Sequence, residues 1–137
     1  MFDSSKPAHA RALHRLASEE VIWLTTVTPA GQPQPSPVWF WWDGEESWIY
    51  SGQTARVANI RANPLVALNF NGDEAGDDTA IIEGIARIDE GAPAASEVPG
   101  YVERYDRLVP AIGMTWDTFC SHYRIPIRIR PTGFRGW

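Results

Sequence analysis

Residues 21–51 read VIWLTTVTPAGQPQPSPVWFWWDGEESWIYS and contain three apolar runs separated by turn residues. The runs are Val21–Thr28, Gln34–Trp42 and Ser47–Ser51. β-branched and aromatic residues dominate them, which is typical of strands, and the intervening Pro, Gly and Asp residues favour tight turns. This pattern predicts three consecutive antiparallel strands. Pro35 and Pro37 lack amide hydrogens, so the second of these strands cannot be fully paired where it begins.

Helical and strand patterns alternate in the rest of the chain. We predict helices over residues 4–18, 54–63, 101–109 and 115–123, and further strands over Leu65–Phe70, Ala80–Ile88 and Ile125–Arg130. Gly84 marks a bulge in the second of these strands. An acidic loop is expected over residues 71–79 and a polar connection of variable conformation over residues 90–99. Six strands with short helices predict a mainly β protein, a small antiparallel barrel.

The overall composition indicates one ordinary globular domain over residues 1–137. Of the 137 residues, 44% are hydrophobic and 21% charged, which suits a single core. No apolar run is long enough to cross a membrane, and the N-terminus has no signal-peptide pattern. The formal net charge of -5 argues against nucleic-acid binding. We therefore expect a cytoplasmic protein with neither nucleic-acid nor membrane partners.

Common catalytic and metal motifs are missing from the sequence. Glycine-rich nucleotide loops, the G-x-S-x-G elbow and H-E-x-x-H do not occur. Cys120 and His122 lie two apart on a predicted helix and point away from each other, so a buried, inert thiol is favoured over a nucleophile. His9 and His14 lack metal-ligand spacing, and Asp77 with Asp78 is better explained as a solvated loop. No metal site is predicted.

The segment Tyr50–Arg56 (YSGQTAR) can be interpreted in two ways. A strand ends in small polar residues, and a helix begins with Thr54 and Arg56 in its first turn. Backbone amides, a hydroxyl and a guanidinium can together hold a phosphate. An ordinary capped helix explains the same residues equally well.

Tryptophans gather close to this segment. Four of the seven lie within ten residues of each other, at Trp39, Trp41, Trp42 and Trp48. Such clustering favours a core or a dimer interface over a ligand platform.

Three motifs together carry a resemblance to a known superfamily. They are T-x-x-P-x-G-x-P in the first hairpin, Y-S-x-x-T-x-R from Tyr50, and N-I-R-x-N-P-x-V from Asn59. The run from Trp23 to Phe70 thereby resembles the pyridoxamine 5′-phosphate oxidase-like, flavin-binding split-barrel superfamily. It looks most like the branch of reductases that depend on the deazaflavin F420, and the C-terminal IRIRPTGFRGW is similar to the tail of that branch.

The resemblance implies a homodimer of six-stranded antiparallel split β-barrels with cofactor sites at the subunit interface. The implied activity is hydride transfer between F420 and a small conjugated substrate. The alternatives are an FMN-dependent oxidoreductase and a non-catalytic binder of flavin, deazaflavin or haem. Pyridoxamine phosphate oxidation is not expected, because the serine–arginine–lysine phosphate grip of the oxidase is reduced here to one cation.

The resemblance also implies a set of cofactor-binding residues but no catalytic one. They are Pro37, Val38, Trp39, Phe40, Tyr50, Ser51, Gln53, Thr54, Arg56, Arg61 and, from the partner subunit, Trp137. Among these, the resemblance implies that the phosphate is bound by Thr54, Arg56 and Arg61. Lys6, Arg11 and Arg15 on the first predicted helix are candidates to hold the oligoglutamate tail of F420.

Overall fold

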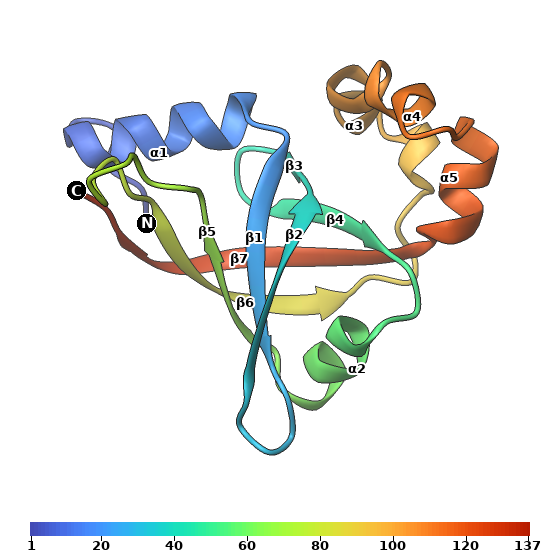
Figure 1. The fold of residues 1–137 in the computed structure, drawn as a ribbon, viewed down its shortest axis with the longest axis horizontal. Helices are drawn as coiled ribbons and strands as arrows, with labels where there is room; N and C mark the ends of the chain where they lie inside the picture. Colours follow the sequence, from blue (N-terminus) through green and yellow to red (C-terminus); the bar gives the residue numbers. More distant parts are fainter.

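The computed structural model describes residues 1–137 and is built around one antiparallel sheet (Figure 1). Its strands are β1 (Val21–Val27), β2 (Pro33–Trp39), β3 (Trp41–Trp42), β4 (Ser47–Ser51), β5 (Leu65–Asn69), β6 (Ile81–Ile88) and β7 (Ile125–Arg135). The helices are α1 (Pro7–Ser18), α2 (Ala55–Ala62), α3 (Pro99–Tyr105), α4 (Leu108–Ala111) and α5 (Trp116–His122), with a 3-10 turn over Ala95–Glu97. The prediction of a mainly β, antiparallel protein with short helices is confirmed.

The order of the strands explains why the sheet curls. Across the sheet they follow each other as β2-β1-β5-β6-β7-β4-β3, so β2 and β3 are the two edges. Only Phe40 separates these edge strands along the chain, and one residue spans less than about 4 Å. The sheet must therefore bend into a curled half-barrel. The predicted six strands become seven, because the strand expected over Gln34–Trp42 is interrupted at Phe40.

Tyr105 on α3 accounts for the interruption at Phe40. Its hydroxyl accepts a hydrogen bond from the Phe40 amide at 2.7 Å. The same hydroxyl lies 2.6 Å from the Glu20 carbonyl and 2.7 Å from the Phe40 carbonyl, to one of which it donates. Buried backbone groups need such partners, which neighbouring strands usually supply. At Phe40 the side chain of Tyr105, 65 residues away in sequence, takes the place of a neighbouring strand.

The prolines of β2 occupy positions that an edge strand tolerates. Pro35 and Pro37 lie opposite Thr25 and Trp23 of β1, and β2 has no strand on its other side. A proline whose missing amide hydrogen faces this open side removes no hydrogen bond between strands. β2 thus pairs with β1 along its whole length and is unpaired only on its outer side, where the prolines predict it.

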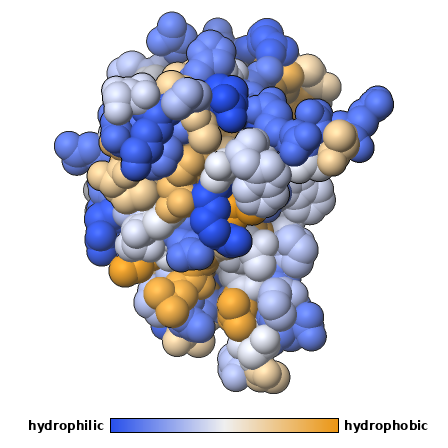
Figure 2. Space-filling view, turned by 90° about the vertical axis from the view of Figure 1, so that its left-hand side faces the viewer, coloured by the Kyte–Doolittle hydropathy of each residue, from blue (hydrophilic) through white to orange (hydrophobic).

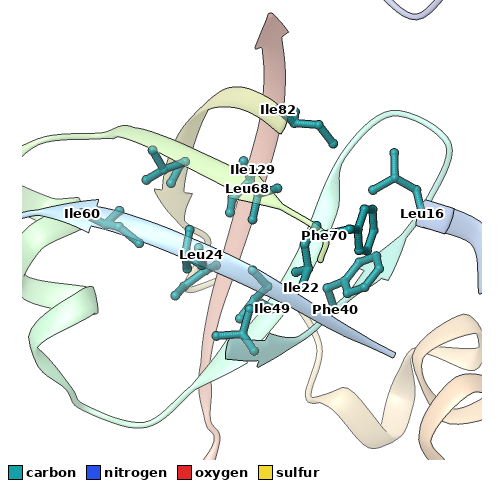
Figure 3. Close-up of a cluster of buried hydrophobic side chains, with 14 of the residues drawn as sticks. Leu16, Ile22, Leu24, Phe40, Ile49, Ile60, Leu68, Phe70, Ile82 and Ile129 are labelled. Carbon is teal, nitrogen blue, oxygen red and sulfur yellow. The ribbon is translucent and has the colours of Figure 1, made fainter. Parts of the chain in front are cut away.

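The main hydrophobic core fills the inside of the curled sheet (Figure 3). Strand residues alternate between this interior and the outer face, as in β1, where Ile22 and Leu24 are buried. Two helices close the interior, α1 with Ala12 and Leu16 and α2 with Val57 and Ile60.

A second core lies outside the sheet, where α3, α4 and α5 gather at one end of the molecule (Figure 1). The Trp39 ring stacks on Tyr105 with centroids 4.6 Å apart. Gly100 allows α3 to approach Trp41, because a Cβ at this glycine would lie 2.2 Å from the indole. Trp48 packs on the same cluster. These tryptophans are therefore partly buried against the second core within one chain.

Several predicted boundaries shift in the structure. The cap of α1 is Lys6 rather than a serine, and residues 101–109 divide into α3 and α4. Strand β7 continues to Arg135, because its second half pairs with Ile81–Gly84 of β6. The connection over residues 90–99 is anchored by the buried Ala95 and Val98 rather than variable. The bulge predicted at Gly84 is confirmed, and α5, capped by Thr115, lies within the helix predicted over residues 115–123.

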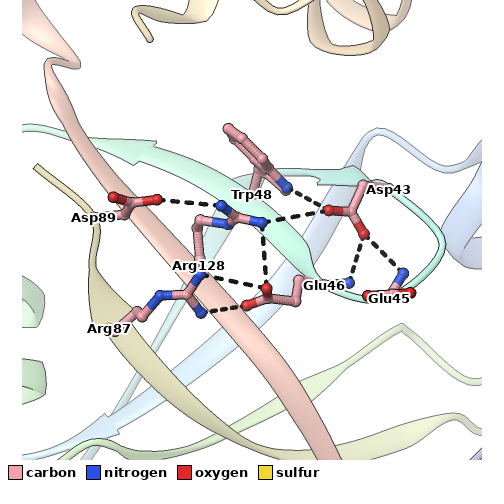
Figure 4. Close-up of polar contacts among 7 residues, drawn as sticks. All are labelled: Asp43, Glu45, Glu46, Trp48, Arg87, Asp89 and Arg128. Atoms are coloured by element: carbon pink, nitrogen blue, oxygen red, sulfur yellow. Dashed lines mark hydrogen bonds and ion pairs between the residues drawn. The ribbon is translucent and has the colours of Figure 1, made fainter. Parts of the chain in front are cut away.

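An arginine-centred network ties the β3–β4 turn to β7 (Figure 4). The Arg128 guanidinium lies 3.2 Å from both Glu46 and Asp89 and 3.6 Å from Asp43. It also stacks 4.0 Å from the centre of the Trp48 ring. The network therefore holds edge strand β3, through its hairpin partner β4, against the rest of the sheet.

We expect acid to weaken this network at Asp43. Burial acts to raise the pKa of this carboxyl, but hydrogen bonds from the Glu46 amide and the Trp48 indole outweigh it, so the pKa lies below its ordinary 3.8. A lowered folded-state pKa stabilises the fold above the ordinary value, and this contribution is lost as pH falls through the lowered value. Urea unfolding at about pH 5 and pH 3 should show a smaller loss for Asp43→Asn than for the wild type; equal losses would contradict this role.

Candidate functional site

An apolar cleft of about 580 Å³ lies between the sheet and the helices α3–α5. Its walls come from β1, β2, β4, α2, α3 and the segments around α4 and α5. They are formed by Val21, Pro37, Val38, Trp39, Tyr50, Arg56, Tyr101, Ile112, Phe119 and Tyr123. Arg56 is the single charged residue among them. Concave, mostly aromatic sites with few polar groups are typical of small-molecule and cofactor pockets.

Arg56, in the first turn of α2, is half-buried in the wall of the cleft. Its guanidinium donates to the Ser36 hydroxyl of β2 at 3.1 Å and to the Ser51 hydroxyl of β4 at 3.3 Å. No carboxylate pairs with it. Burial lowers the pKa of the guanidinium from its ordinary value, but arginine stays charged at neutral pH. A desolvated cation held only by neutral hydroxyls has capacity left for an anion.

The other buried or half-buried arginines have stronger partners. Arg128 has three carboxylates, Arg15 pairs with Glu19, and Arg104 donates to four backbone carbonyls at the end of α1 and at Phe40. Arg56 therefore differs from them in being left without an acidic or carbonyl partner.

The hydroxyl groups beside Arg56 come from the predicted strand-to-helix turn. Thr54 is the N-cap of α2, but its side chain makes no capping hydrogen bond. Instead its hydroxyl lies 3.5 Å from that of Ser51. The side-chain cap that the ordinary-helix interpretation of this turn requires is therefore absent.

The structure brings together some of the predicted site residues. Pro37, Val38, Trp39, Tyr50 and Arg56 line the cleft, and the buried Ser51 contacts Arg56. The Tyr50 hydroxyl donates to the Pro93 carbonyl at 2.8 Å, and burial raises its pKa to about 12.

Other predicted residues lie elsewhere. The Phe40 side chain is fully buried in the main core, because it follows the inward-facing Val38 by two residues. Gln53 and Arg61 border a separate polar hollow, where Arg61 pairs with Glu90 at 3.1 Å.

Trp137 lies near the N-terminal end of the fold, away from α3–α5 (Figure 1). Its backbone pairs with Thr79 next to β6. Within one chain this tryptophan is therefore not part of the cleft.

The basic residues of α1 do not line the cleft; Arg11 and Arg15 border a separate hollow with Asp78. Arg11 pairs with Asp78 and Arg15 with Glu19, so their charges are already balanced. Lys6 caps the same helix. Figure 2 views the molecule from the side on which α1 and the chain ends lie, and hydrophobic residues appear there as separate patches. The contact with an oligoglutamate tail stays a prediction.

Half of the cleft comes from residues that sequence reasoning did not select. They are Val21, Tyr101, Ile112, Phe119 and Tyr123. Four of them belong to the region between β6 and β7, which the motifs do not cover. The Tyr101 hydroxyl is buried and has no hydrogen-bond partner within the chain. No local pattern marks these residues, since the packing of α3–α5 on the sheet brings them to the cleft.

The fold was also compared with the requirements of a metal site and of a membrane-spanning helix. No group of three or more His, Cys, Asp and Glu side chains is arranged to hold a metal ion. None of the helices combines the length and apolar character that a bilayer crossing needs.

Comparisons with solved structures identify the fold. An F420 reductase is 26% identical, with a TM-score of 0.61 over 89% of this chain and 94% of that one. A conserved hypothetical protein from Mycobacterium tuberculosis is 26% identical, with a TM-score of 0.69 over 93% and 82% of the two chains. The heme storage protein HutZ from Vibrio cholerae shares the fold at 16% identity, with a TM-score of 0.62 and coverage of 91% and 92%.

A family model agrees with these structures. No curated protein matches the chain. The model described as pyridoxamine 5′-phosphate oxidase matches residues 7–119, which include the curled sheet up to β6 and the helices that complete the cleft. With the motifs of residues 23–70 inside this match, the chain belongs to the pyridoxamine 5′-phosphate oxidase family.

Proposed function

We propose that this protein is an oxidoreductase that binds the deazaflavin F420 in the cleft and reduces a small conjugated organic substrate. The observation that carries the proposal is Arg56, a half-buried cation without an acidic partner in an aromatic cleft. The family fold binds flavins, and an F420 reductase is among the similar structures.

The residues of the cleft fit such a cofactor. Arg56, Ser36 and Ser51 would hold a phosphate, while Trp39 and Tyr50 offer flat apolar surface to a ring. Tyr101 also lines the cleft, and its buried hydroxyl has no partner within the chain. When bound, F420 supplies hydride transfer without the ready reaction with oxygen of a flavin.

The chain itself contributes positioning rather than acid–base chemistry. No carboxylate or imidazole lines the cleft, and the Tyr50 hydroxyl is engaged with a carbonyl. Aromatic walls exclude water and keep a ring and a substrate face to face, which by itself lowers a barrier substantially.

The alternatives are an FMN-dependent oxidoreductase and a non-catalytic binder of flavin, deazaflavin or haem. No histidine lines the cleft, so the commonest axial ligand for haem iron is missing there. Titration of the purified protein with F420, FMN and haem tests the proposal. We expect F420 to bind most tightly; a preference for FMN or haem, or no binding of F420, would overturn it.

We also propose that the protein is a homodimer whose interface covers the mouth of the cleft. Val21 and Ile112 line the cleft yet are 46% and 48% exposed. Exposed apolar residues that border a concave site are typical of interfaces. Sedimentation at micromolar concentration should give about twice the chain mass. The double variant Val21→Lys with Ile112→Lys should shift the measured mass toward that of a monomer. Leu65→Lys, at an exposed apolar residue outside the cleft, should not. A wild-type monomer would contradict the proposal.

A further inference from the structure

We propose that the anion site of the cleft selects a phosphate with one negative charge, a phosphodiester, over the dianion of a phosphomonoester. This inference rests on the proposed function and names the class of cofactor that the site takes. F420 carries its phosphate as a diester, whereas FMN is a monoester. The charges that surround Arg56 are the basis of the selection.

The first step is a count of the charges in the cleft. Arg56 is the single charged side chain among the lining residues. Its partners, Ser36 and Ser51, are neutral, and the Thr54 hydroxyl beside them is neutral as well. One phosphodiester anion would therefore be balanced by one cation.

No second cation lines the cleft to balance a dianion. Arg61, one turn further along α2, faces a separate hollow and pairs with Glu90 at 3.1 Å. Arg124 borders that hollow too and is exposed. The arginines of α1 are engaged with Asp78 and Glu19.

An unbalanced charge is costly at this position. The cleft is lined mainly by aromatic and aliphatic groups, and burial already disfavours the charge on Arg56. A dianion would leave one uncompensated negative charge in these surroundings, with the desolvation penalty that such charges carry. A phosphomonoester can escape this penalty by binding a proton, because its second pKa is about 6.

The site itself has no group that would obscure such a proton uptake. The titratable groups that face the cleft are Arg56 from α2, Tyr50 from β4, Tyr101 from α3 and Tyr123 after α5. The lining residues from β1, β2, α4 and α5 carry no acid or imidazole. Guanidinium and phenol groups ordinarily titrate at about pH 10 or above. His122, whose carbonyl lies beside Gly52, is the imidazole near this turn, and a diester ligand, whose phosphate gains no proton between pH 5.5 and 7.5, reports any contribution from it.

The test compares two flavins that differ only in the phosphate. FMN is the monoester, and riboflavin 5′-(methyl phosphate) is a diester with the same ring. Binding is followed by quenching of flavin fluorescence at pH 5.5 and pH 7.5. If only the monoanion binds, the dissociation constant of FMN should rise by about twentyfold across this range, following the fraction of monoanion. The constant of the diester should change by less than about twofold.

A variant with an added cation tests the physical cause. Thr54→Lys places an ammonium beside Ser51 and removes a hydroxyl that caps nothing. In this variant FMN should bind at pH 7.5 almost as tightly as at pH 5.5. A wild-type pH dependence retained in Thr54→Lys would contradict the charge explanation.

The remaining outcomes separate the two proposals. FMN binding that is equally tight at both pH values would overturn the selection for a single charge and leave the proposed function standing. Absence of binding by F420 and by both flavins at either pH would overturn the proposed function itself.

Discussion

Replacement of Tyr105 by phenylalanine should lower the free energy of unfolding by about 2 kcal/mol, although only one oxygen atom is lost. The hydroxyl accepts from the Phe40 amide at 2.7 Å and donates to a neighbouring carbonyl. Tyr105 is fully buried, so water cannot replace these bonds without opening the second core. A backbone donor left unpaired in such surroundings costs its full desolvation penalty.

Tyr101→Phe is a matched control for this variant. Both tyrosines lie on α3, both are fully buried, and their rings are 4.7 Å apart. The Tyr101 hydroxyl has no partner, so its removal should leave stability unchanged or slightly raised. Urea unfolding of both variants provides the measurement. Equal stability of the two would show that the Tyr105 bonds do not hold the junction between β2 and β3.

The second large effect is expected at Arg56. Arg56→Ala removes from the cleft a charged guanidinium that could donate two parallel hydrogen bonds to a phosphate. Such contacts contribute roughly 1.5–3 kcal/mol, so F420 affinity should fall by about tenfold to a hundredfold. Arg56→Lys should recover only part of it, because lysine keeps the charge but not the planar fork. Stability should change little, since burial works against the guanidinium and no carboxylate loses a partner.

Two further variants sharpen the interpretation of Arg56. Arg130→Ala removes an exposed arginine on β7, outside the cleft, and should leave affinity unchanged. Thr54→Ala should also leave stability nearly unchanged, because the Thr54 side chain makes no capping bond. A loss of about 1 kcal/mol in Thr54→Ala would instead support an ordinary helix cap. Full F420 affinity in Arg56→Ala would contradict the phosphate site.

Local sequence was enough for the elements that depend on local patterns. The strands at Val21–Val27 and Ser47–Ser51, helix α2 and the bulge at Gly84 appear where periodicity and turn chemistry predict them. The family motifs also lie on contiguous residues. Arg56 could be found in this way because a strand end, a turn and a helix start adjoin along the chain.

Other parts of the cleft could not be predicted, because distant segments create them. The seventh strand exists because Tyr105 satisfies the backbone of Phe40 from 65 residues away. Tyr101 and Phe119 reach the cleft only when their helices pack on the tryptophans of the outer face. Phe40 lies outside the cleft, because its side chain, two residues after the buried Val38, points into the main core.

The sequence by itself therefore determined the family, the antiparallel β class and the strand-to-helix turn that carries Arg56, where we propose the anion site. Periodicity, turn residues and short motifs are local properties of the chain, and local interactions are enough to turn them into strands, turns and helices. The tertiary structure alone decided which arginines remain unpaired and which aromatic rings face the cleft. Ion pairing and burial depend on contacts between residues far apart in the chain, and these contacts exist only after the sheet has curled and α3–α5 have packed against it.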